Sequence, residues 1–111
     1  MESIKIKPLS INDAWQGRRY KTTAYNKYAE EVGLLLLKKT KPTIKSKQVR
    51  IYYVFHLSNM RADVDNFIKA FQDILFKWLG IDDSRIYRLT AEKVKCKKGQ
   101  ERIEWGITEY D

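Results

Sequence analysis

Apolar residues recur along the chain at two different spacings, which predict two helices and four strands. Two segments carry apolar residues at intervals of three and four, as one face of a helix requires: 23–39 and 64–79. Four segments show the alternation or the β-branched and aromatic content of strands: 4–6, 49–56, 85–95 and 101–108. The predicted order is β-α-β-α-β-β, and the last two strands are expected to form a hairpin about the turn at 97–100.

This order of elements is typical of an α+β fold in which two helices pack on one mixed sheet. A length of 111 residues suits a single domain spanning 1–111. Residues 10–21 have no clean periodicity and hold Gly17 beside two arginines, so we interpret them as a mobile basic loop. His56 is expected at the surface, because it lies on the polar side of its predicted strand.

Composition excludes several classes of protein. The longest aliphatic run, Leu34–Leu37, is far shorter than the roughly 20 apolar residues of a membrane helix. The first residues lack the apolar stretch of a signal peptide, so we expect a cytoplasmic protein with no membrane partner. The single cysteine, Cys96, excludes an intrachain disulfide and a thiolate metal site.

The charge of the chain is unevenly distributed. Lysine and arginine outnumber aspartate and glutamate by 22 to 14, a net charge of +8 that favours a polyanionic partner such as nucleic acid. Residues 63–83 nevertheless hold five acids and two cations, a local charge of −3, which leaves +11 on the rest of the chain. An acidic segment inside a basic chain suits a nuclease, because the basic surface holds phosphates and the carboxylates hold a metal ion.

The acidic residues around the second predicted helix are candidate metal ligands. Asp63 and Asp65 alternate at its start, so an extended backbone would point both carboxylates the same way, and Lys69 follows one turn later. Asp82 and Asp83 come after the helix, and the return of the chain could bring one of them beside the first pair. Such an aspartate-only site in a phosphate-binding protein would fit Mg²⁺. Phosphodiester hydrolysis is then the expected reaction.

Ordinary structural roles also explain these residues. Asp63 or Asp65 could cap the helix, and Asp65 and Lys69 could form a surface ion pair worth about 0.3–0.5 kcal/mol. Asp73 stands four residues after Lys69 and could pair with it on the helix face. Asp82 and Asp83 could form a simple turn.

A set of polar positions recurs at fixed spacing: Arg61-x-Asp63-x-Asp65-Asn66-x-x-Lys69, then Asp73 and Leu75, then Asp82-Asp83-x-x-Ile86. This pattern closely resembles the signature of the RusA family of Holliday junction resolvases. The stretch Ser10-Ile11-Asn12, followed by Arg18-Arg19-Tyr20, is similar to the N-terminal pattern of the family. The likeness covers about residues 8–108. Val64 stands where the family often has leucine, a change that should leave the two acids in place.

The resemblance implies a homodimeric, Mg²⁺-dependent endonuclease, in which Mn²⁺ can substitute, that cuts two opposing strands of a four-way DNA junction during recombination and repair. Asp63, Asp65 and Asp83 would be catalytic and hold the metal, with Asp82 as the second choice, and Lys69 would assist. The expected DNA contacts are Asn12, Arg18, Arg19, Lys21, Arg61 and Lys69, and the charged segments 38–50 and 93–102 are further candidates. The protein would be encoded by a bacterium or by a phage.

Two other functions fit the sequence. A DNA-binding regulator could keep the same fold without useful nuclease activity, although the intact set of acids and lysine argues against decay of the site. A metal-dependent nuclease acting on RNA or on flap substrates would show the same charge pattern.

Overall fold

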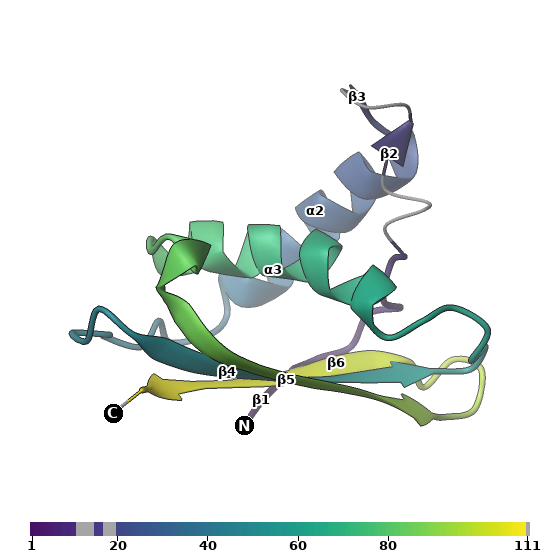
Figure 1. The fold of residues 1–111 in the computed structure, drawn as a ribbon. Helices are drawn as coiled ribbons and strands as arrows, with labels where there is room; N and C mark the ends of the chain where they lie inside the picture. The colour runs from purple at the N-terminus through teal and green to yellow at the C-terminus, as the bar shows by residue number, and fades with distance from the viewer. Residues whose placement is uncertain (11–14, 17–19, 111) are drawn as a thin grey trace.

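A four-stranded sheet with two helices on one face makes up most of the described chain in this computed structural model, which covers residues 1–10, 15–16 and 20–110 (Figure 1). The elements in chain order are β1 (Glu2–Ile4), β2 (Trp15–Gln16), β3 (Tyr20–Lys21), α2 (Thr23–Leu36), β4 (Val49–Leu57), α3 (Asp65–Leu79), the short 3-10 helix η1 (Asp83–Arg85), β5 (Ile86–Lys95) and β6 (Arg102–Glu109). The predicted α+β class, the mixed sheet and the order of the main elements are confirmed.

The sheet has the strand order β1-β6-β4-β5, which contradicts the predicted hairpin of the last two strands. β4 lies between β5 and β6, parallel to the first and antiparallel to the second. The reason is α3, which carries the chain across from β4 and returns β5 in the same direction along one side of β4. β6 therefore pairs on the other side of β4, and β5 forms an edge of the sheet.

β4 is the central strand and is buried on nearly its whole length. Its alternate residues Ile51, Tyr53 and Phe55 face the helices and are at most 2% exposed. On the opposite face Val54 and His56 are 6% and 7% exposed. The expectation that His56 lies at the surface is wrong, because Glu104 on the neighbouring β6 covers the ring and bonds to its Nε2.

α3 lies along the sheet because one of its faces is continuously apolar. Phe67, Phe71 and Leu75 are buried, and the ring of Phe71 contacts Tyr53 edge-on at a centroid distance of 5.8 Å. The helix ends at Gly80, whose φ of 75° is the left-handed conformation that glycine adopts without a steric penalty. Its N–H donates to the carbonyl of Phe76 at 3.0 Å, which closes the last turn.

α2 rises away from the sheet at an angle to α3 (Figure 1). Thr22 caps its first turn, since the hydroxyl oxygen accepts a hydrogen bond from the Tyr25 N–H at 3.1 Å. The helix ends at Leu36 rather than at the predicted residue 39. Within the segment interpreted as a loop, the backbone of β2 pairs with that of β3, so the loop prediction is wrong at these four positions.

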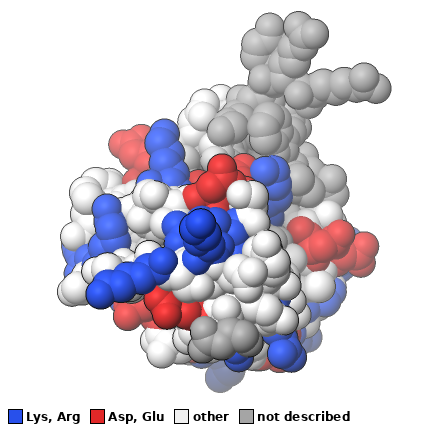
Figure 2. Space-filling view, turned by 60° about the vertical axis from the view of Figure 1, so that its left-hand side comes forward, with Lys and Arg blue, Asp and Glu red and all other residues white. Residues whose placement is uncertain are grey.

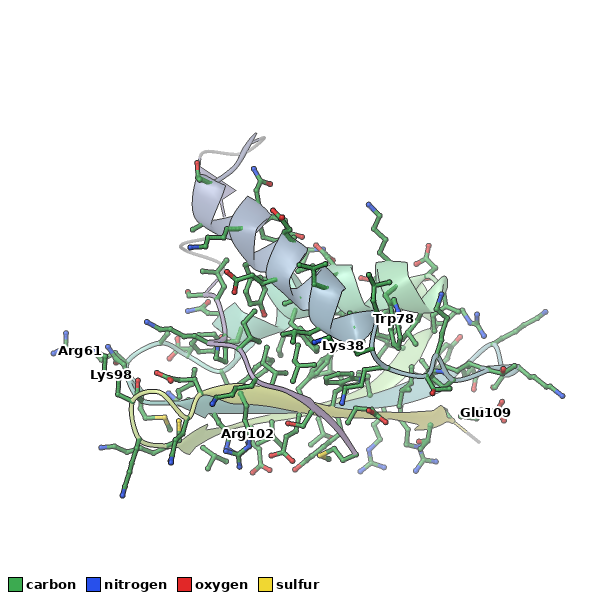
Figure 3. The ribbon with its side chains drawn as sticks, turned by 180° about the vertical axis from the view of Figure 1, so that it is seen from behind. Lys38, Arg61, Trp78, Lys98, Arg102 and Glu109 are labelled. Carbon is green, nitrogen blue, oxygen red and sulfur yellow. The ribbon has the colours of Figure 1, made fainter. Side chains whose placement is uncertain are left out.

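The second face of the sheet carries no helix among the described residues. Side chains of alternate residues on β4, β5 and β6 lie on this open face, including Arg102 (Figure 3). No described helix is both long enough and apolar enough to span a bilayer.

Replacing Phe71 with alanine tests the packing of α3 on the sheet. Phe71 is fully buried between Tyr53 and Trp105, so the Phe71→Ala substitution should lower the free energy of unfolding by about 3–5 kcal/mol. Urea denaturation followed by circular dichroism measures the change. Leu34→Ala is the control, because Leu34 is 58% exposed and its loss should cost less than about 0.5 kcal/mol. Equal losses for the two variants would contradict this packing.

Candidate active site at the two ends of α3

The loop between β4 and α3 is held in place by side chains from β5 and from the β5–β6 turn. The ammonium of Lys93 donates to the carbonyl oxygens of Met60 and Ala62, both at 2.8 Å. At the start of the loop, the hydroxyl of Ser58 donates to Glu101 at 2.8 Å. These contacts fix the backbone immediately before Asp63.

Asp63 and Asp65 lie at the N-terminal end of α3 with their side chains exposed. Val64 occupies the N-cap position, and neither carboxylate caps the helix, so the capping role is not observed. The carbonyl oxygen of Asp63 instead accepts from the Asn66 N–H at 3.1 Å. Within the described part of the chain, neither carboxylate takes part in a hydrogen bond or an ion pair.

Lys69 pairs with Asp73 rather than with Asp65. Its ammonium lies 3.0 Å from the Asp73 Oδ1, one turn further along α3. The hydrogen bond to Asp73 raises the pKa of Lys69, and the charge of Asp83 adds to the same effect. The lysine therefore stays protonated at neutral pH and directs its charge toward the C-terminal half of the helix.

Asp82 and Asp83 lie beyond the C-terminal end of α3. The carboxylate of Asp82 accepts the Ser84 N–H at 2.8 Å, which caps the short η1 helix and lowers the pKa of Asp82. Asp83 is half-buried, and together with Asp73 it lines a shallow hollow of about 310 Å³. Figure 2, which brings this end of the molecule forward, shows basic and acidic side chains close together.

The candidate carboxylates thus form two groups: Asp63 and Asp65 at the start of α3, and Asp82 and Asp83 after its end, next to Asp73. Asp63 and Asp65 lie at the start of α3, whereas Asp83 lines the same hollow as Asp73, two turns further along the helix. No group of three His, Cys, Asp or Glu side chains placed to hold a metal ion occurs among the described residues. Within one molecule, Asp83 therefore does not complete a three-carboxylate metal site with Asp63 and Asp65.

The first group has the chemistry of a magnesium site. Mg²⁺ in proteins takes oxygen ligands, usually one or two carboxylates completed by water and substrate phosphate. Asp63 and Asp65 supply two exposed carboxylates that no described cation neutralises. The donor set at this end of α3 therefore fits Mg²⁺, with ligands still to be supplied by water, phosphate or a second molecule.

Some of the predicted DNA contacts can be located in the structure. Arg61 is exposed at the same end of the molecule as the Asp63 and Asp65 pair, and Lys98 from the β5–β6 turn projects there as well (Figure 3). Asn12, Arg18 and Arg19 lie outside the described residues. Lys21 belongs to β3, whose backbone alone is described.

Lys93 is a positioning residue that the sequence did not single out for this role. As part of a charged segment it was a candidate DNA contact, whereas its ammonium bonds to the loop that carries Asp63. The only signal for this role in the sequence is that a charged lysine occupies a strand position whose side chain should face the helices. The two carbonyl partners are 31 and 33 residues away, so spacing could not reveal them.

Lys93→Met should loosen this loop without removing the apolar stem of the side chain. The two carbonyl oxygens would lose a charged donor, at a cost of about 1–2 kcal/mol in a half-buried setting. Hydrogen–deuterium exchange should speed up in residues 58–64 and stay unchanged in β4. Lys95→Met is the control, because Lys95 is exposed and should leave the loop protected. Unchanged exchange in the Lys93 variant would count against the positioning role.

Comparison with known proteins identifies the family to which the chain belongs. No curated protein matches the sequence. A family model described as "Endodeoxyribonuclease RusA" matches residues 9–107, which include both groups of aspartates, Lys69 and nearly all of the sheet. Because the match covers almost the whole chain, the protein belongs to the RusA endodeoxyribonuclease family.

Proposed function

We propose that this protein is a Mg²⁺-dependent endonuclease that resolves four-way DNA junctions and acts as a homodimer. The observation that carries the proposal is the exposed pair Asp63 and Asp65, followed one turn later by Lys69, in a chain that the RusA family model matches over residues 9–107. The net charge of +8 supports a DNA substrate. The expected location is the cytoplasm of a bacterial or phage-infected cell.

We assign each of these residues a role in the proposed reaction. Asp63 and Asp65 would hold Mg²⁺, for which Mn²⁺ can substitute, and Arg61 would hold a phosphate beside them. When bound, the metal ion neutralises charge on the phosphate and lowers the pKa of a water molecule. Lys69 is protonated and would donate a hydrogen bond to a phosphate oxygen or to the leaving group. Asn12, Arg18, Arg19 and Lys21 remain DNA contacts proposed from the sequence alone.

The separation of the carboxylates supports a dimer. If Asp83 belongs to the same site as Asp63 and Asp65, a second molecule would supply it, because the described residues of one chain form no group of three acids placed to hold a metal ion. A two-fold dimer would build two equivalent sites of this kind, which suits a junction that is itself close to two-fold symmetric. Asp83 is a better candidate than Asp82, whose carboxylate is engaged in capping η1.

Asp65→Asn should lower the cutting of a labelled four-way junction at least about a hundredfold in Mg²⁺, because it removes a metal ligand. Binding of the junction should be unchanged or tighter, since a negative charge facing phosphate is lost. Gel assays of cutting and binding measure both, with an equal-length duplex and a single strand beside the junction. Glu31→Gln on α2 is the control, as an exposed acid distant in sequence from both groups.

The substrates and the metal separate this function from the alternatives. Cutting restricted to the junction supports a resolvase, whereas cutting of flaps or RNA at a similar rate would identify a different nuclease. Binding without cutting, with or without Mg²⁺, would identify a DNA-binding regulator. Full turnover by the Asp65 variant would remove the assignment of the site.

Coexpression of Asp65→Asn and Asp83→Asn chains tests whether two molecules share a site. In a shared site, each mixed dimer would combine Asp65 from one chain with Asp83 from the other, so about a quarter of all sites would be intact. The mixture should then nick one strand of the junction, while either variant alone should not. If each chain holds its own complete site, the mixture should be as inactive as the separate variants.

A further inference from the structure

A hollow of about 390 Å³ lies on the open face of the sheet, and neither group of aspartates lines it. It is centred on Gly106, which stands opposite Tyr52 in the antiparallel register of β6 and β4. A Cβ atom built at Gly106 would meet no heavy atom within 4 Å, so the space above this glycine is open. The lining is Met1, Arg50, Ile51, Tyr52, Arg88, Thr90, Gly106 and Thr108, which includes no carboxylate.

Two arginines on neighbouring strands border this hollow. Arg50 and Arg88 are direct partners in the parallel register of β4 and β5, and both are exposed. Among the described residues neither forms an ion pair, and like charges at paired positions repel each other. An anionic group bound between the two guanidinium groups would remove this repulsion and accept hydrogen bonds from both.

Aromatic side chains lie next to the arginine pair. The Arg50 guanidinium stands 5.4 Å from the centre of the Tyr110 ring, and Tyr87 stacks on the same ring at 6.1 Å. A register shift at the start of β4 and β5 places Tyr87 as an extra residue before Arg88. Tyr52 lines the hollow itself, and its hydroxyl donates to Glu92, which anchors the ring against the sheet.

We propose that this hollow binds one unpaired nucleotide of a DNA strand. Arg50 and Arg88 hold its phosphate, and its base enters the space above Gly106 against the ring of Tyr52. A sheet face with aromatic rings and flanking arginines is suited to an unstacked base, whereas the bases of a duplex are covered by their neighbours. The choice of DNA over RNA rests on the proposed function.

Charge favours a nucleic acid over a second copy of this chain at this face. The chain carries a net charge of +8, so a second copy would in general oppose the arginine pair with a basic surface. The site also lies beside the end of the sheet at which β5 begins, three residues after Asp83. A strand bound here is therefore close to the C-terminal end of α3.

Gly106→Val is the decisive variant, because it fills the hollow while leaving all charges in place. The open space around Gly106 and the preference of valine for strands should preserve the fold, which circular dichroism and thermal unfolding check. Fluorescence anisotropy with a labelled twelve-residue oligothymidylate should show affinity reduced about tenfold. An abasic strand of equal length should bind the variant and the unchanged protein equally.

The double variant Arg50→Gln with Arg88→Gln should weaken the binding of both strands about tenfold, since it removes the phosphate contact. Lys5→Gln with Lys27→Gln is the control of equal net charge, because both lysines are exposed, one just after β1 and the other on α2. It should change the affinity less than about twofold.

Several outcomes would overturn the inference. The first two are that Gly106→Val binds the base-bearing strand as tightly as the unchanged protein does, and that the lysine control pair loses as much affinity as the arginine pair. The third is that polyglutamate displaces the bound strand as readily as oligothymidylate does. The fourth is that the arginine variants convert a dimer of the protein to monomers. Binding is measured without Mg²⁺ and without cutting. A protein that binds the strand through this hollow but cuts no junction would support the inference and contradict the proposed function.

Discussion

The packing of α3 against β4 determines where the functional groups of this protein lie. Phe67, Phe71 and Leu75 bury one face of the helix on the sheet, and the aromatic contacts with Tyr53 and Phe55 hold its axis along the strands. The loop before the helix and the turn after it must then lie at opposite ends of the sheet. Asp63 and Asp65 belong to the start of the helix and Asp82 and Asp83 to the turn after it, so core packing fixes where both groups of acids lie.

The local signals in the sequence were sufficient for the separate elements. The apolar stripe and Gly80 define α3, and the alternation around Tyr53 defines β4, because helix and strand periods are properties of short segments. The same local signals were not sufficient to predict which strands pair. The turn at 97–100 indicated a hairpin, yet β5 pairs with β4 because α3 forces a parallel return, and this is a long-range effect. His56 was misplaced for the same reason, since its burial depends on Glu104, 48 residues away.

The sequence placed the candidate site residues along the chain but did not determine their arrangement in space. The predicted helix placed Asp63 just before α3 and Asp65 and Lys69 in its first turns, as observed, because the helical period is a local property of the sequence. Their relation to Asp83 depends on the path after Gly80, which spacing does not determine. The sequence allowed Lys69 to pair with either Asp65 or Asp73. In the structure Lys69 pairs with Asp73, which leaves the Asp65 carboxylate available to other partners.

The position of β5 at the edge of the sheet has a consequence for solubility. A ten-residue edge strand presents unpaired backbone groups that can recruit a strand from another molecule and start aggregation. Charged side chains at Arg88, Glu92, Lys93 and Lys95 run along this edge, and burying them beside an added strand would be unfavourable. The charged side chains of β5 thus oppose the joining of two copies of the protein edge to edge.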